Sequence, residues 1–240
     1  MARVTARDDA ATWGDAQPDE RIRWVYERLV AMWGTPAWEP DGDALGGLIA
    51  TILSQHTSDL NSERAYARLR AAFPDWTAVR DAPMEAVAEA IRVGGLAQVK
   101  AARIQQVLRA VSERHGGAPD LAELDDLSLT DARAALLALP GVGPKTAACV
   151  LLFSLGRPAF PVDTHVWRVT RRLGLIGPKV TADAAHLELE RQIPPAWRHT
   201  MHVDLIQHGR RICHPQRPEC ERCELRARCE YYWATQRREG

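Results

Sequence analysis

Four of the five cysteines stand within 17 residues near the C-terminal end of the chain. They are spaced C-x6-C-x2-C-x5-C, and they are Cys213, Cys220, Cys223 and Cys229. Such clustering in a chain of 240 residues indicates a metal site rather than a disulfide framework. Four soft thiolate ligands can hold a tetrahedral zinc ion or a four-iron cluster, and the spacing alone leaves both open. Cys149 stands apart in an apolar helical stretch and is expected to be a buried core thiol.

A glycine-containing turn lies in the string LPGVGPKTA, which runs from residue 139 to residue 147. Glycine allows backbone conformations that are closed to other residues. The amides of Gly141, Val142 and Gly143 would lie beside the start of the next helix, where they can hold a phosphate group. An isolated G-x-G is more often only a tight turn that joins two core helices, and that alternative stays open at this point.

Lys145 and Asp163 are the residues whose types could carry covalent chemistry. Lys145 lies just inside the expected helix N-terminus, where the helix macrodipole disfavours the ammonium form and helps to expose a neutral amine. Such an amine can attack the C1′ carbon of a sugar and form a Schiff base. Such chemistry also needs a carboxylate to stabilise the positive charge that builds on the sugar. Taken singly, Lys145 could equally be a phosphate contact, and Asp163 a helix N-cap without chemistry.

Apolar residues recur at helical spacing along nearly all of the chain. The elements that position these residues are therefore expected to be helices, and the fold is expected to be all-α. Asp43 is expected to cap a helix with a buried stripe at i, i+3, i+4, i+7 and i+8, formed by Leu45, Leu48, Ile49, Ile52 and Leu53. Thr130 is expected to cap the helix before the glycine turn, which makes a helix-hairpin-helix with the apolar helix that follows. Further helices are expected at about 163–173, 181–192 and 196–209.

Two helical lobes are expected to form from these elements, since 240 residues can bury a substantial core. The first is a six-helix domain over residues 41–156, which includes the hairpin. The second combines residues 19–40 with 157–236 and ends in the cysteine loop. Residues 1–18 are expected to be a disordered tail. The site would lie between the lobes, with Lys145 on one side and Asp163 on the other.

The charge of the whole chain balances, with 31 basic and 31 acidic residues, and so argues neither for nor against a nucleic acid partner. Its distribution is uneven, because residues 163–179 carry four basic side chains against the single acid Asp163. No apolar run approaches the roughly 20 residues that a membrane span needs. We therefore expect a monomer that does not enter membranes and is cytoplasmic and associated with the nucleoid.

Three motifs carry a resemblance to a known family. The string at 139–147 resembles the hairpin signature of the helix-hairpin-helix DNA glycosylase superfamily. The segment PVDTHVWRV, at 161–169, is similar to the Val-Asp-Thr-His segment of that superfamily. The cysteine loop that follows is similar to the loop of the endonuclease III branch. The resemblance extends from about residue 22 to residue 232, and three motifs in the family's order make it specific.

The resemblance implies a bifunctional DNA glycosylase and AP lyase in base excision repair. Such an enzyme removes oxidised pyrimidines from double-stranded DNA and cleaves abasic sites by β-elimination. It implies that Lys145 is the nucleophile, because the bifunctional members carry lysine at this position, and that Asp163 is the stabilising carboxylate. It also implies a [4Fe–4S] cluster on the four cysteines of the loop, and no diffusible cofactor.

Two further residues are expected to contact DNA, since an enzyme that extrudes a nucleotide leaves a gap in the base stack. The segment LSQHTSD, at 53–59, resembles a family loop that carries a plugging glutamine. In the preferred register His56 takes that place, and Gln55 stands one residue earlier. Leu96 resembles the leucine that wedges beside the extruded base. As alternatives, His56 could be a capping or core histidine, and Leu96 a hydrophobic C-cap contact.

Two other functions remain as alternatives at this stage. One is a monofunctional glycosylase for alkylated, mismatched or uracil bases, in which Lys145 only binds DNA. The other is a non-catalytic iron–sulfur module that binds DNA. The presence of both Lys145 and Asp163 argues against the second.

Overall fold

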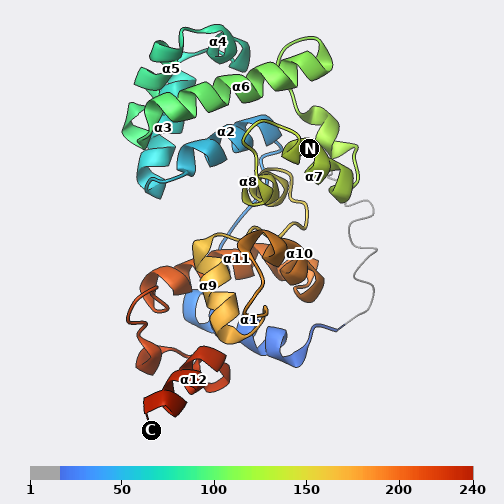
Figure 1. The fold of residues 1–240 in the computed structure, drawn as a ribbon. Coiled ribbons are helices and arrows are strands. Elements are labelled where there is room, and N and C mark those ends of the chain that lie inside the picture. Colours follow the sequence, from blue (N-terminus) through green and yellow to red (C-terminus); the bar gives the residue numbers. More distant parts are fainter. Residues whose placement is uncertain (1–16, 240) are drawn as a thin grey trace. The chain divides into compact units, whose positions relative to one another are not determined.

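The computed structural model describes residues 17–239, and their regular structure is helical, with no strand in that range (Figure 1). The expectation of an all-α fold is confirmed. The tail expected at residues 1–18 lies almost wholly outside the described residues. Among the helices in the described range, none is both long and apolar enough to cross a bilayer. The chain divides into two compact units, of which one is Pro40–Gly156 and the other combines the chain before Pro40 with the chain from Arg157 onward.

The unit Pro40–Gly156 contains seven α-helices, and its three shorter turns are two 3₁₀ turns and a π turn. The helices are α2 (Ala44–Ser54), α3 (Asp59–Ala72), α4 (Trp76–Asp81), α5 (Met84–Ala90), α6 (Ala97–His115), α7 (Leu129–Leu137) and α8 (Pro144–Cys149). The turns are Arg92–Gly94, Ala122–Asp125 and, directly after α8, Val150–Ser154.

The long helix α6 organises this unit, because it contacts α4 and α5 as well as α2 (Figure 1). Its apolar face is fully buried, as is the stripe of α2 that the sequence predicts. On α2, the side chains with no exposed surface are Leu48, Ile49, Ile52 and Leu53. Burial of such a side chain stabilises the fold by about 1.5–3 kcal/mol. Asp43 caps α2 as expected, and its carboxylate accepts a 2.7 Å hydrogen bond from the Gly46 amide.

Two details of this unit differ from the expectation. The sequence predicts six helices, and the additional one is α4, which Asp75 caps by accepting a hydrogen bond from the Ala78 amide at 2.7 Å. The predicted cap of α7 is also wrong, since Ser128 takes that role and its hydroxyl accepts from the Asp131 amide at 3.1 Å. Thr130 therefore lies inside the first turn of α7.

The other unit contains α1 (Glu20–Trp33), α9 (Thr164–Leu173), α10 (Ala182–Gln192), α11 (Arg198–Arg211) and α12 (Glu230–Glu239). Helix α11 packs against both α1 and α9, and α9 also contacts α10 and α12. The core they share includes Ile22, Leu29, Phe160, Val166, Leu189 and Leu205. The cysteine loop lies between α11 and α12 and has two 3₁₀ turns, Cys220–Arg222 and Arg226–Arg228.

Candidate functional site

The hairpin between α7 and α8 is a tight turn in which the two glycines have different roles. Gly141 has a φ of +71°, a left-handed conformation that favours glycine, whereas Gly143 has a φ of −99°. A Cβ atom at Gly143 would meet no atom within 4 Å. The sequence predicts that the glycines adopt backbone conformations closed to other residues, and only Gly141 does so. Gly143 instead leaves open space directly before α8.

The amide of Val142 does not point out of the turn, because it donates a 3.2 Å hydrogen bond to the Leu139 carbonyl. The Val142 side chain is only 7% exposed and packs into the core. Val142 therefore anchors the turn, and its amide is engaged where the sequence suggested a phosphate contact. The prediction of a phosphate contact at the hairpin therefore concerns the amides of Gly141 and Gly143.

Lys145 is the second residue of α8, as the sequence predicts, and its side chain is partly buried. Gly143 occupies the N-cap position and has no side chain to satisfy the amides of this first turn. Unsatisfied amides and the helix dipole make such an end favourable for an anion and unfavourable for a neighbouring cation. The next residue, Thr146, accepts a 3.5 Å hydrogen bond from the Gln55 side chain. The start of α8 is therefore linked to the segment that carries His56.

Asp163 is the N-cap of α9, and its Oδ1 accepts a 2.7 Å hydrogen bond from the Val166 amide. Asp163 is thus a helix N-cap, which is the alternative that the sequence left open. The residues just before it are buried, and the His202 ring nitrogen Nδ1 lies 2.8 Å from the Pro161 carbonyl oxygen. The capping bond orients the Asp163 side chain, the buried residues before it fix its backbone, and the residue itself is partly exposed.

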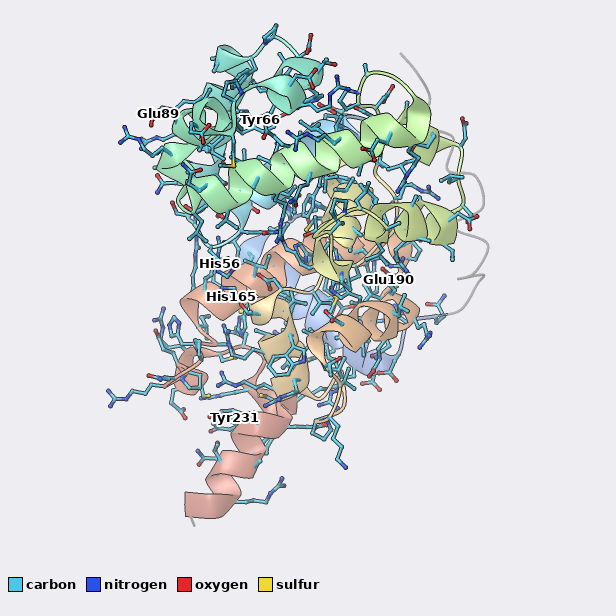
Figure 2. All side chains as sticks on the ribbon, turned by 45° about the horizontal axis from the view of Figure 1, so that its top comes forward. His56, Tyr66, Glu89, His165, Glu190 and Tyr231 are labelled. Carbon is cyan, nitrogen blue, oxygen red and sulfur yellow. The ribbon has the colours of Figure 1, made fainter. Side chains whose placement is uncertain are left out.

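His56 and Leu96 both have left-handed backbones, with φ values of 53° and 48°. Both side chains are exposed, and Leu96 retains 56% of its surface. His56 follows the end of α2 and is labelled in Figure 2, while Gln55 occupies the C-cap position of that helix. The core-histidine alternative for His56 is therefore wrong, whereas the capping alternative stays open, because His56 directly follows the C-cap residue of α2 with a left-handed backbone. Leu96 stands at the N-cap position of α6, directly after Gly95, the C-cap of the turn Arg92–Gly94, and its exposure argues against a hydrophobic C-cap contact.

All four cysteines of the loop have free thiols, and all four line one hollow in the surface of their unit. Tyr231, labelled in Figure 2, lines the same hollow. Burial raises the pKa of the Cys223 thiol to about 12 and also raises the pKa values of Cys220 and Cys229. The protein alone thus disfavours the thiolate form, and a bound multivalent cation would reverse that preference.

Two side chains contact the cysteine sulfurs, and the sequence did not assign such a contact to either of them. Arg172 donates to Cys213 Sγ at 3.3 Å and to the His214 carbonyl at 2.7 Å. His208 is 1% exposed, and its Nε2 lies 3.5 Å from Cys223 Sγ. The signal for Arg172 was available, because Arg168 and Arg172 are four residues apart and so share a face of α9. Arg168 likewise donates to the Cys213 carbonyl at 2.9 Å.

Four thiols that line one hollow are a donor set compatible with a cluster of iron and sulfide. In the described part of the chain, no three His, Cys, Asp or Glu side chains lie close enough to hold one metal ion. In a tetrahedral zinc site all four thiolates bind the same ion at about 2.3 Å, which draws the sulfurs together. In a four-iron cluster each cysteine binds a different iron, so thiols that surround a hollow are compatible with it.

A family model for HhH-GPD superfamily base excision DNA repair proteins matches residues 49–195. The matched segment begins within α2 and includes the hairpin, Lys145 and Asp163. The fold and the hairpin therefore define the class, that of helix-hairpin-helix base excision DNA repair proteins.

Similar proteins and solved structures indicate which family within this class the chain belongs to. The chain is 35% identical over 214 residues to endonuclease III of Thermotoga maritima, which covers 89% of this chain and 92% of that protein. It is 38% identical over 169 residues to a protein of Arabidopsis thaliana named as a DNA glycosylase, covering 70% of this chain and 57% of the plant protein. Solved endonuclease III–DNA complexes, one non-covalent and one a trapped covalent intermediate, match at 27% identity with a TM-score of 0.75 and cover 92% of this chain and 100% of theirs. The chain belongs to the endonuclease III family of DNA glycosylases.

Proposed function

We propose that this protein is a bifunctional DNA glycosylase and AP lyase, which removes oxidised pyrimidines from double-stranded DNA and then cleaves the abasic strand. The observation that carries the proposal is the position of Lys145 in the first turn of α8, two residues after the open N-cap at Gly143. Nucleophilic attack on C1′ requires an amine, and the open helix N-terminus beside Lys145 is a place where a backbone phosphate can bind. The endonuclease III relatives support the same assignment.

In the proposed reaction, the Lys145 amine attacks C1′ of the damaged nucleotide. A bond forms between Nζ and C1′, the glycosidic bond breaks, and the base leaves with a proton. Asp163 stabilises the positive charge that develops on the sugar during this step. The sugar ring then opens to a protonated Schiff base. Loss of a proton from C2′ expels the 3′ phosphate and breaks the strand, and water finally releases the Lys145 amine.

Binding is proposed to come from contacts that do not read sequence. The amides of Gly141 and Gly143 approach a backbone phosphate, and the absence of a side chain at Gly143 permits that approach. His56 and Leu96 fill the gap that the extruded nucleotide leaves in the stack. Their exposure fits this role, because an apolar side chain that is 56% exposed contributes little to the core of its own unit.

The four cysteines of the loop are proposed to hold a [4Fe–4S] cluster. When bound, the cluster supplies cross-links that fix the loop after α11, in the way that structural metals contribute folding free energy to small domains. Arg172 donates toward Cys213 Sγ and stabilises thiolate charge there, and the His208 ring contacts Cys223 Sγ. The arginines of the fixed loop then meet DNA phosphates, and they are Arg217, Arg222, Arg226 and Arg228.

The proposal is tested with a panel of duplexes, each of which carries one defined lesion. Base release and strand breakage are measured separately, by resolving the products with and without alkali. A duplex with thymine glycol should be broken without alkali. Breakage only after alkali would mean a monofunctional glycosylase, in which Lys145 serves DNA binding. No base release from any lesion would contradict a catalytic role altogether.

A further inference from the structure

Lys100 is a buried cation within the unit Pro40–Gly156. It lies in the first turn of α6 and is only 3% exposed. Its ammonium group donates to the carbonyl oxygens of Leu53 and Gly94, each at 2.8 Å. Burial lowers the pKa of Lys100, so its charge is held at a cost in desolvation. A lysine buried in this way lowers the stability of the fold unless the hydrogen bonds of its ammonium group offset the lost hydration.

The two carbonyls that accept from Lys100 each end a helical element. Leu53 lies in the last turn of α2, which ends at Ser54, and Gly94 is the last residue of the 3₁₀ turn Arg92–Gly94. Carbonyls at such ends lack partners within their own helix, and the dipole there favours a positive charge. One ammonium group therefore caps two elements that are about 40 residues apart in the sequence.

Each capped element leads directly into an exposed residue with a left-handed backbone. His56 follows Leu53 by three residues, and Leu96 follows Gly94 by two. A left-handed conformation costs about 1–2 kcal/mol for a residue with a Cβ atom, and it persists only where its surroundings fix it. The contacts of Lys100 fix the start of both segments. The ammonium group is thus a single tie between the segment of His56 and the segment of Leu96.

We propose that Lys100 is a positioning residue for nucleotide extrusion, which holds the segments of His56 and Leu96 at a fixed separation so that both side chains enter the gap in the duplex together. This inference rests on the proposed function, since it assigns DNA contacts to these two residues. The physical reason is pre-organisation: two loops that move independently must both be ordered at the moment of insertion, whereas tied loops are ordered beforehand.

The same helix provides a matched control. Gln105 also lies on α6, is 3% exposed, and donates to two backbone carbonyls, those of Val79 at 3.0 Å and Ala82 at 2.8 Å. Those carbonyls belong to the end of α4 and the residue after it, away from the segments of His56 and Leu96. Gln105→Met therefore removes the same number of hydrogen bonds to backbone carbonyls as Lys100→Met, two in each case, without releasing either segment.

The experiment compares Lys100→Met with Gln105→Met in the full-length protein, after thermal unfolding has shown that both variants fold. Single-turnover excision is measured on a duplex with thymine glycol. A second duplex places 2-aminopurine opposite an abasic analogue, where its fluorescence rises when stacking is disrupted. Lys100→Met should slow excision by roughly tenfold to a hundredfold, the scale of a misplacement by about 1 Å. It should also reduce the fluorescence rise, while Gln105→Met leaves both near the parent values.

A further readout separates positioning from a general loss of structure. In a protein that already carries Leu96→Ala, Lys100→Met should slow excision by much less than it does in the parent, because residues that act through one another are not additive. Equal losses in Lys100→Met and Gln105→Met, or an undiminished effect of Lys100→Met in the Leu96→Ala protein, would overturn the proposal. If Lys100→Met does not fold, the shorter and neutral Lys100→Gln takes its place in both comparisons. Failure of the parent to excise any lesion would contradict the proposed function instead.

Discussion

The Asp163 carboxylate accepts a 2.7 Å hydrogen bond from the Val166 amide, and so begins α9 as its N-cap. This bond uses Oδ1 and orients the carboxylate through the backbone of the helix. An N-cap and an electrostatic stabiliser are thus compatible roles for one side chain, because the cap fixes one oxygen and leaves the group partly exposed. The two roles differ in what they require, since a cap needs only an acceptor, whereas the sugar cation needs a negative charge.

Asp163→Asn is therefore expected to separate the two roles. Asparagine caps helices about as well as aspartate, so the melting temperature should change little. Base removal should slow by a hundredfold or more, because a neutral amide cannot stabilise a cationic sugar as a carboxylate does. Asp163→Ala should lose the rate and in addition about 1 kcal/mol of stability. Single-turnover excision and thermal unfolding measure these effects, and an unchanged rate in Asp163→Asn would leave Asp163 as a cap alone.

The two glycines of the hairpin should respond differently to alanine. Gly141→Ala forces a Cβ into a left-handed conformation and should destabilise the protein by about 1–2 kcal/mol. Gly143→Ala should leave stability within about 0.5 kcal/mol, since its Cβ would enter open space, yet weaken DNA binding by obstructing a phosphate. Urea unfolding and fluorescence anisotropy at one fixed salt concentration provide the comparison. If Gly143→Ala binds an abasic duplex as tightly as the parent, the turn is purely structural.

Removal of one loop cysteine should cost the protein its colour. The parent should be brown when purified without exposure to chelators, and Cys220→Ala should lose the visible absorption and unfold more readily. Cys149→Ala is the matched control, because that thiol is buried among core residues of the other unit, and its loss should leave the colour unchanged. Stoichiometric zinc without iron in the parent would refute the assignment of the cluster.

Asp204 should make stability depend on pH in an unusual direction. It is fully buried, neither of its carboxylate oxygens has a hydrogen-bond partner among the described residues, and burial raises its pKa to about 7 from 3.8. A carboxyl group whose pKa is raised by folding binds its proton more tightly in the folded state. The contribution of Asp204 to the free energy of unfolding therefore falls as the pH rises from about 4 to 7, by roughly 1 kcal/mol per pH unit.

Asp204→Asn removes this titration, so the variant should gain stability relative to the parent as the pH rises through that window. Urea unfolding of both proteins at pH 5 and at pH 7.5 gives the difference directly. A stability difference that is the same at both values would show that Asp204 does not hold its proton in the folded protein.

The sequence predicted those parts of the fold that have a long and regular pattern. The buried stripe of α2 and its Asp43 cap were predictable, because eleven residues show the helical period clearly. Helix α4 was not, since six residues span less than two turns and display no period. The cap of α7 was misplaced because Ser128 and Thr130 are both suitable cap residues, and the hydrogen bond from the Asp131 amide shows that Ser128 takes the role.

In the site, residue types were easier to predict than their hydrogen bonds. Lys145 stands in the first turn of α8 as expected, because the proline and glycine before it mark a helix start. The engagement of the Val142 amide with Leu139 depends on the conformation of the turn, which residue types do not specify. The bridge made by Lys100 joins segments far apart in the chain, so no local pattern could indicate it.

The measurement that bears most directly on the central claim is borohydride trapping of the parent protein on a duplex with one abasic site. If Lys145 attacks C1′, borohydride reduces the protonated Schiff base to a stable amine, and protein and DNA migrate as one covalent species. Lys145→Gln should give no such species while it retains much of the DNA affinity, because other contacts hold the backbone. A crosslink that persists in Lys145→Gln, or its absence from a parent protein that still releases bases, would contradict the account.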